Sequence, residues 1–419
     1  MKLKPLFTLL LLLIESACRQ PEPVPTGDPD LAADATNRFG LDLYRRLAPV
    51  DENFGISPYS LETALVMTFA GADGATRKEM VEVLHLAADD DRLHESFHTL
   101  RYQLQEVEKN SAKIVSKTKL HEAGEPITLT VANQLFGQKG SDFREPFLNL
   151  LKQRHAARPE TVDFAGNPSR ATHRINAWIA DRTHQRLRNV LPPEALNAET
   201  RLVVANAIYL KAQWDKPFDA GATELLPFHV RGGETANVPT MTTLLDTCAY
   251  VKHDGFVALS VPYFDWNFRF LILVPDDAKG LPELEARITP AILAEKFEIE
   301  TEKVELSLPK FKFEPATLRL GSTLRDLGMA TAFKQGPGGA NFDRMAQPNS
   351  GLYLGEVFHK IFIAVDEKGT EAAGAGASGG FLGVPPEPVQ VKIDRPFFYA
   401  IQHLPTFTCL FIGHVTDPR

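Results

Sequence analysis

The stretch IFIAVDEKGTEAAGAGASGGFLGVPP, residues 361–386, joins two kinds of sequence at a charged turn. Its first part, Ile361 to Val365, has the β-branched and aromatic residues of a strand. Its second part consists mainly of Gly, Ala and Ser and stops at two prolines, so we expect an exposed, mobile loop. Alternate loop positions are small and uncharged, so one face of the loop could enter a sheet without burying charge; these are Thr370, Ala372, Gly374, Gly376 and Ser378.

Helical patterns lie mostly in the first half of the chain and strand patterns in the second. Leu31 to Leu47 has helical spacing, whereas Leu202 to Leu210 is an apolar, strand-like run. This order predicts an α+β fold, with helices packed on a large, mostly antiparallel sheet system. Further helices are expected over residues 61–69, 78–86, 92–108, 143–155, 172–187 and 318–327, and strands over 128–136, 249–251, 258–263, 268–274, 304–313, 390–393, 397–403 and 408–415.

Composition narrows the functional class. The chain has 419 residues, 44% of them apolar, which is enough for one large core, and no repeat or interior linker divides it. A net charge of −8 without a basic tract argues against nucleic acid as a partner. Of three cysteines, Cys409 lies in an apolar run and Cys248 stands alone, so no disulfide framework is indicated.

The first thirty residues have the pattern of an export signal and a tether. Lys2 and Lys4 precede an apolar segment, Leu6 to Ile14, that is too short to span a bilayer. Ser16-Ala17-Cys18 resembles the end of a bacterial lipoprotein signal, in which Cys18 would carry the lipid. Ordinary secretion, or retention of the segment, is the alternative. We therefore expect a signal peptide over 1–18, a proline-rich tether over 19–30 and a single domain over 31–419.

The segment Glu367 to Ala375, EKGTEAAGA, resembles the reactive-loop hinge of the serpins, a family of serine-protease inhibitors. Asn53 to Ser60 is similar to the family pattern Asn-x-x-x-Ser-Pro-x-Ser. Asn206 to Trp214 is similar to its central strand, with Ala212 where glycine is usual. The resemblance runs from about Leu31 to Pro418 and, with the N-terminal signal, suggests a bacterial lipoprotein-type inhibitory serpin. Other matching segments, in order, are Leu308 to Phe311, Leu327 to Met329, His359 to Lys360 and Asp394 to Phe397.

The resemblance implies a serpin fold with an exposed reactive-centre loop, and an irreversible suicide-substrate inhibitor of serine, or cysteine, endopeptidases. The chain would then be no enzyme: it would have no catalytic residue, metal or cofactor of its own, and its partner would be a protease bound covalently as an acyl-enzyme. We expect an exported monomer, anchored in a membrane through lipid or secreted. The hinge that inserts into the sheet after cleavage would comprise Glu367, Gly369, Thr370, Ala372, Ala373, Gly374 and Ala375.

The bond that a protease cuts follows from counting within the resemblance. The scissile bond usually lies about seventeen residues after the hinge glutamate, which gives Gly383–Val384 as the primary assignment. Phe381 and Leu382 are alternates, because glycine gives a specificity pocket little to hold. Elastase-like, chymotrypsin-like or subtilisin-like targets follow. Trypsin-like targets do not, because Lys and Arg are absent between Thr370 and Gln390.

The resemblance implies six further site residues: four form a polar cluster beneath the centre of the main sheet, where family members open to admit the loop, and two lie near the hinge. A hydrogen-bonded polar cluster there could hold two arrangements of the sheet. Lys310 is expected to pair with Glu367 at the base of the hinge, and Trp214 to lie at the top of the sheet. The polar cluster would contain Ser57, Ser60, Asn206 and His359.

Three other sequence patterns are typical of other functions, but their surroundings argue against each of them. His94-Glu95-Ser96-Phe97-His98 spells the zinc-peptidase motif, although no well-placed third ligand follows and a solvated helix face is the simpler interpretation. The glycine-rich loop also spells a nucleophile elbow at Ser378 and a dinucleotide motif, but both need a helix directly afterwards, which 381–386 cannot begin. A non-inhibitory binding protein with the same fold is the remaining alternative, and the small residues from Thr370 to Ala377 speak against it.

Overall fold

The computed structural model describes residues 24–86, 89–117, 125–231, 233–246, 248–296, 303–348, 350–370 and 387–419. Within them, helices combine with three mostly antiparallel sheets, which confirms the predicted α+β class. The helices are α2 (Pro29–Leu47), α3 (Pro58–Phe69), α4 (Gly74–Val83), α5 (Asp90–Lys117), α6 (Glu145–His155), α7 (Pro168–Arg182), α8 (Leu281–Arg287), α9 (Pro290–Leu293) and α10 (Gly321–Asp326), with short 3₁₀ turns η1 (Ala220–Ala222), η2 (Phe264–Trp266) and η3 (Thr331–Phe333).

The three sheets differ in size and role. The six-stranded sheet has the order β1 (Phe54–Ile56), β18 (Thr408–Val415), β17 (Phe397–His403), β9 (Phe268–Pro275), β8 (Phe256–Pro262) and β7 (Ala249–His253). The four-stranded sheet has the order β16 (Val389–Lys392), β10 (Val304–Pro309), β6 (Thr235–Leu245) and β5 (Glu224–His229). The main sheet contains β3 (Glu160–Val162), β2 (Thr128–Gln138), β4 (Leu202–Gln213), β13 (Leu354–Ile361), β12 (Leu318–Arg319), β15 (Gly369–Thr370), β14 (Ile363–Asp366) and β11 (Phe311–Phe313).

Strand β4 is the centre of the main sheet. Along one side it pairs antiparallel with β2 over ten residues, from Leu202 to Lys211. Along the other side it first pairs parallel with β13, from Leu202 to Ile208. It then pairs antiparallel with β15 at Ala212 and Gln213, and β15 in turn pairs with β14. The main sheet is therefore forked: β13 is the neighbour of β4 in one half, and the β14–β15 hairpin is its neighbour in the other.

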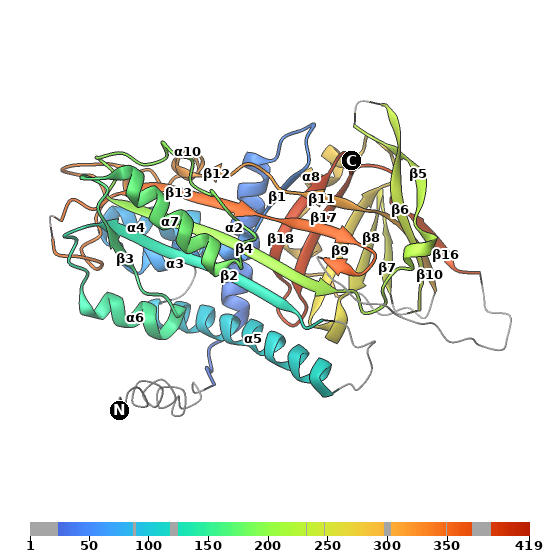
Figure 1. Cartoon of the computed structure of the whole chain (residues 1–419), viewed down its shortest axis with the longest axis horizontal. Helices are drawn as coiled ribbons and strands as arrows, with labels where there is room; N and C mark the ends of the chain where they lie inside the picture. Colours follow the sequence, from blue (N-terminus) through green and yellow to red (C-terminus); the bar gives the residue numbers. More distant parts are fainter. Residues whose placement is uncertain are drawn as a thin grey trace, which may run out of the picture.

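The two faces of β4 are buried in different cores because successive side chains of a strand alternate between faces. Val204, Ile208 and Ala212 face the large core shared with the six-stranded sheet and with α2 and α3. Val203, Ala205 and Ala207 face a smaller core that includes residues of α7. Figure 1 shows α7, in green, crossing one face of the main sheet, with the six-stranded and four-stranded sheets toward the other end of the molecule. Burial on both faces explains why β4 is apolar almost throughout.

Helix α3 lies beneath the main sheet, and its start is fixed locally. The Ser57 side chain accepts a hydrogen bond from the backbone N–H of Ser60, and Pro58 occupies the first turn, where its missing N–H costs nothing. Every residue of the helix is buried. The start of α3 therefore holds Ser57 and Ser60 against the underside of the main sheet.

The structure corrects several sequence-based boundaries. The strand expected over 304–313 is two strands in two sheets, because β10 ends at Pro309 and β11 starts at Phe311. Leu318–Arg319 is a short strand rather than the start of a helix. Residues 224–245, for which no strand was predicted, form β5 and β6. Gly369 and Thr370, expected within an exposed loop, are paired in the main sheet and buried.

Candidate functional site

The candidate site lies where the β14–β15 hairpin meets β4. Asp366 and Gly369 face each other across a two-residue turn, and the Asp366 carboxylate accepts hydrogen bonds from the N–H groups of Lys368 and Gly369 at 2.9 and 3.3 Å. Gly369 has a φ of +153°, and a Cβ atom there would lie 2.2 Å from the carbonyl oxygen of Ala212. Only glycine therefore allows the hairpin to approach β4 this closely.

Glu367, in the turn of the hairpin, is clamped from three directions. The Lys310 ammonium donates to its two carboxylate oxygens at 2.9 and 2.8 Å, and the Thr223 hydroxyl donates at 2.8 Å. The backbone N–H of Phe218 donates to its carbonyl oxygen at 2.7 Å. Burial by itself raises the pKa of Glu367, but the hydrogen bonds from Lys310 and Thr223 outweigh it and lower the pKa, so the carboxylate stays ionised. The Lys310–Glu367 pairing expected from the sequence is present.

Trp214, predicted at the top of the sheet, holds the other side of the same turn. Its indole N–H donates to the Asp366 carbonyl oxygen at 3.0 Å, and its backbone N–H donates to that of Lys368 at 2.8 Å. Its ring stacks on Tyr263, with 4.6 Å between centroids and 13° between planes. The Tyr263 hydroxyl lies 2.6 Å from the Thr370 hydroxyl. Thr370 is only 1% exposed, so its side chain already points into the core.

A buried polar cluster joins β4, β13 and α3 in the other half of the sheet. The backbone N–H of Ser57 donates to His359 Nε2 at 3.0 Å, so Nδ1 carries the proton and donates to the Asn206 side-chain oxygen. The Asn206 amide group donates to the hydroxyl of Ser60 and to the side-chain oxygen of Asn133. Burial lowers the pKa of His359 to about 3, so the ring is neutral. The structure thus brings together Ser57, Ser60, Asn206 and His359, as predicted.

We call the half of the main sheet in which β4 lies against β13 the closed half, and the half in which it lies against the β14–β15 hairpin the forked half. The two halves share one register. His359 is the direct neighbour of Asn206 on β4. In the forked half, Val365 and Ala212 stand on either side of Thr370, and they differ by the same number of positions as His359 and Asn206. Strand β15 therefore occupies a slot that continues, without a shift, along the line where β4 and β13 meet.

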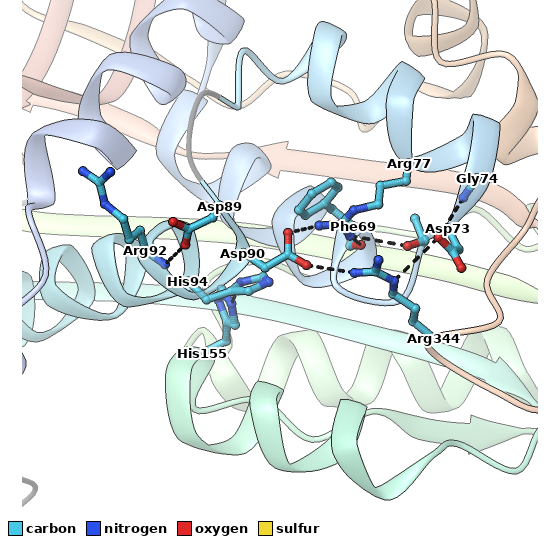
Figure 2. Close-up of polar contacts among 11 residues, drawn as sticks. Phe69, Asp73, Gly74, Arg77, Asp89, Asp90, Arg92, His94, His155 and Arg344 are labelled. Carbon is cyan, nitrogen blue, oxygen red and sulfur yellow. Dashed lines mark hydrogen bonds and ion pairs between the residues drawn. The ribbon is translucent and has the colours of Figure 1, made fainter.

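Among the described residues, the His-Glu-x-x-His pattern on α5 does not form a metal centre, and the expected solvated helix face is wrong, because His94 and His98 are both buried. The rings of His94 and His155, which belong to α5 and α6, lie next to each other (Figure 2). His94 Nδ1 is 3.0 Å from His155 Nε2. Glu95 instead pairs with Arg154, and burial lowers the pKa of His94 to about 4. Across the described parts of the chain, no group of three or more His, Cys, Asp or Glu side chains is placed to hold a metal ion.

Next to the His94–His155 pair, charged side chains link α5 to α4. The Asp90 carboxylate lies between the guanidinium groups of Arg77 and Arg344, and Arg344 also reaches Asp73 (Figure 2). The Arg77 guanidinium stacks over Phe69 at 3.8 Å from the ring centre. These contacts are structural: they fix the start of α5 on the body of the molecule.

Several predicted residues lie outside the described residues. They are the reactive-bond residues Phe381, Leu382, Gly383 and Val384, the hinge residues Ala372, Ala373, Gly374 and Ala375, and the signal segment with Cys18. Ser378 of the nucleophile-elbow pattern lies there too. Within the described residues, no helix is long and apolar enough to cross a membrane.

Sequence reasoning missed three residues of this region. Asn133 joins the polar cluster because β2 places it directly opposite Asn206, a tertiary register that local sequence does not reveal. Tyr263 was predicted only as the last residue of a strand over 258–263. Glu62 of α3 is fully buried, and its carboxyl oxygens have no hydrogen-bond partner among the described residues. Burial raises the pKa of Glu62 well above its ordinary value, and its signal was a lone carboxylate within an apolar helix.

Comparisons with known proteins agree over nearly the whole chain. A sequence profile described as Serpin (serine protease inhibitor) matches residues 34–418. An uncharacterized serpin-like protein of Thermococcus kodakarensis is 35% identical over 390 residues, covering 92% of this chain and 85% of its own. The leukocyte elastase inhibitor of Xenopus tropicalis is 34% identical over 398 residues, 92% of this chain and 99% of its own. The native crystal structure of tengpin, a thermophilic serpin, matches with a TM-score of 0.79 at 26% identity, covering 97% of this chain and 98% of its own.

Proposed function

The chain belongs to the serpin family, and we propose that it inhibits serine, or cysteine, endopeptidases irreversibly as a suicide substrate. The observation that carries this proposal is the position of β15. Gly369 and Thr370 already form a strand between β14 and β4, at the start of the segment that a protease would cut. The first residue pairs of the strand that would be inserted are thus already present before cleavage.

In the proposed reaction, the protease supplies all of the covalent chemistry. Its serine hydroxyl or cysteine thiol adds to a loop carbonyl carbon, and the peptide C–N bond breaks as the new amino terminus leaves with a proton. The N-terminal part of the loop stays attached to the protease as an ester or thioester. The inhibitor contributes a cleavable bond and the subsequent movement, so it needs no catalytic residue.

The shared register defines where the freed loop would go. If the residues after Thr370 continue β15, every second one faces the large core, beginning with Ala372. Gly376 would then pass between Asn206 and His359 and separate that hydrogen-bonded pair. Small side chains at these positions fit such a path, because they add little volume beneath a sheet that is already packed.

The driving force would be a longer hydrogen-bonded ladder and greater burial. Once inserted, the loop would pull the attached protease across the molecule and distort its active site. Serpin loop insertion is itself an established example of a switch that releases stored strain. The glycines at 374, 376, 379 and 380 lower strand propensity, so we expect some acyl-enzyme to hydrolyse and the stoichiometry of inhibition to exceed one.

Elastase-like, chymotrypsin-like and subtilisin-like enzymes are the proposed targets. Phe381 and Leu382 offer apolar side chains to a specificity pocket, and Gly383–Val384 remains the primary bond by counting. The name of one relative, a leukocyte elastase inhibitor, supports the same class. We also propose that the protein is exported and is anchored through lipid at Cys18 or secreted, on the evidence of residues 1–18 alone. The proposal that it acts as a monomer rests on the family resemblance.

The test is incubation with elastase, chymotrypsin, subtilisin and papain. We expect an SDS-resistant complex with at least one of them, and the mass of the released C-terminal fragment identifies the bond. A trypsin-like protease serves as the control and should give no complex. Clean cleavage within 381–384 by every protease, without any complex, would contradict inhibition and favour a serpin-fold binding protein.

A further inference from the structure

Tyr263 makes the side-chain contact that reaches Thr370 from the six-stranded side of the molecule. The two hydroxyl oxygens lie 2.6 Å apart, and both residues are buried. Burial raises the pKa of the Tyr263 phenol, although the bond with Thr370 lowers it somewhat, so the phenol remains protonated and able to donate. A hydroxyl pair of this kind is costly to break on one side, because the remaining hydroxyl is left buried without a partner.

The position of Tyr263 is fixed independently of Thr370. Its ring stacks on Trp214, and an isolated β-bridge joins the two residues. Its backbone N–H donates to the Phe268 carbonyl oxygen at 3.0 Å, and its carbonyl oxygen accepts from Trp266 at 3.0 Å. These contacts hold Tyr263 in place without Thr370, and its hydroxyl group points to the end of β15.

Apart from the backbone pairing of Thr370 with Val365 and Ala212, the contacts that hold the hairpin lie at its turn. Lys310, Thr223 and Phe218 hold Glu367, while Trp214 holds the carbonyl oxygens of Asp366 and Lys368. These contacts would persist if Gly369 and Thr370 left β4. The hydroxyl bond to Tyr263 is thus placed to decide between β15 paired in the sheet and β15 withdrawn from it.

We propose that Tyr263 is a positioning residue that keeps Thr370 in the main sheet before cleavage and so sets the balance between inhibition and plain hydrolysis. This inference rests on the proposed function. With β15 paired, insertion continues an existing strand and is fast. With β15 withdrawn, the free loop is longer and easier for a protease to reach, but insertion must begin anew.

The first experiment needs no protease. Hydrogen–deuterium exchange of the β15 amides is measured in the parent, in Tyr263→Phe, in Thr370→Val and in the double variant. Loss of one buried hydrogen bond should speed β15 exchange on the order of fivefold in each single variant. The double variant should exchange no faster than either single one, because both changes remove the same bond. Thr370→Ser, which keeps the hydroxyl, should restore slow exchange, and Tyr250→Phe is the matched tyrosine control.

The second experiment uses the best protease of the panel. Tyr263→Phe and Thr370→Val should raise both the rate of protease attack and the stoichiometry of inhibition, each on the order of fivefold or less. A change that only loosened packing would not raise the attack rate and the stoichiometry together, nor be rescued by Thr370→Ser.

The outcomes separate the two proposals. Unchanged β15 exchange in both single variants, or effects that add in the double variant, would overturn the role of Tyr263 even if the parent inhibits. If the parent forms no complex with any protease while exchange behaves as expected, the hydrogen bond is supported as the anchor of β15 and the inhibitory function fails. Faster exchange without a change in stoichiometry would also overturn the proposed control of the outcome.

Discussion

The two halves of the main sheet use the same central strand in different ways. From Leu202 to Ile208, β4 lies directly against β13, and the Asn206–His359 contact bridges them beneath. At Ala212 and Gln213, β4 lies against β15, which separates it from β14. One half is closed, while the other already contains an extra strand in the register that the closed half would need. In the proposed mechanism, β15 would be the starting point from which the cleaved loop enters the closed half.

Cleavage of the loop should produce the largest change. If the closed half can open and accept the loop, a cut within residues 381–384 should raise the thermal midpoint by more than about 10 °C. Each kcal/mol of added stability shifts the midpoint of a large domain by about 2–4 °C, so this rise corresponds to a gain of several kcal/mol in the free energy of unfolding. Differential scanning calorimetry of intact and nicked protein measures this. An unchanged midpoint after a clean cut would mean that the closed half stays closed.

A charge at Thr370 should block the passage from one half to the other. Thr370→Arg places a long cation in a buried site, where an unpaired charge costs several kcal/mol. The acyl-enzyme should then hydrolyse before insertion, so the stoichiometry of inhibition should rise at least about tenfold. Glu371→Arg is the neighbouring control, because alternation would direct position 371 to the opposite face of an inserted strand, and it should inhibit nearly normally. Equal stoichiometry for the Thr370 variant and the parent would refute insertion through this slot.

Acid should weaken the closed half through His359. Its pKa is about 3 in the folded protein, against about 6.5 when unfolded, so its contribution to stability is complete above pH 6.5 and is lost as pH falls toward 3. The cost is about 1.4 kcal/mol per pH unit in that window. Urea unfolding at pH 7 and pH 5 should show a smaller loss in His359→Gln than in the parent, whereas the exposed control His173→Gln should behave like the parent. Equal losses in all three proteins would show that His359 does not titrate on unfolding.

The Lys310–Glu367 pair should have the smallest energy. Lys310 is about one-third exposed, and such pairs contribute about 0–1 kcal/mol. Because the pair anchors the turn of the forked half, Glu367→Lys should nevertheless increase polymer formation on mild warming, which native gels or light scattering can follow. Adding Lys310→Glu restores opposite charges and should reduce polymerisation again. If neither variant differs from the parent, the pair does not hold the forked half in place.

Features of the site that lie in family-like sequence motifs could be predicted from the sequence, whereas features that depend on tertiary pairing could not. The polar cluster was predictable because Ser57, Asn206 and His359 lie in segments that resemble family motifs. The pairing of Gly369 and Thr370 was not, because a two-residue strand has no periodicity and its stability comes from neighbours such as Trp214 and Tyr263. The break between β10 and β11 was also hidden, since both pieces are apolar and only the sheets they join tell them apart.

Burial of the Glu62 carboxyl group couples folding to the uptake of a proton at this residue. Between the pKa of the unfolded glutamate and its raised value in the fold, Glu62 binds a proton on folding. Below pH 6.5, four buried histidines with lowered pKa values release protons on folding and oppose this uptake: His94, His155, His359 and His403. The heat measured in unfolding therefore includes the ionisation heat of the buffer. Calorimetry in two buffers of different ionisation enthalpy counts the net protons exchanged, and Glu62→Gln should reduce the proton uptake on folding at a pH above the pKa of the unfolded glutamate.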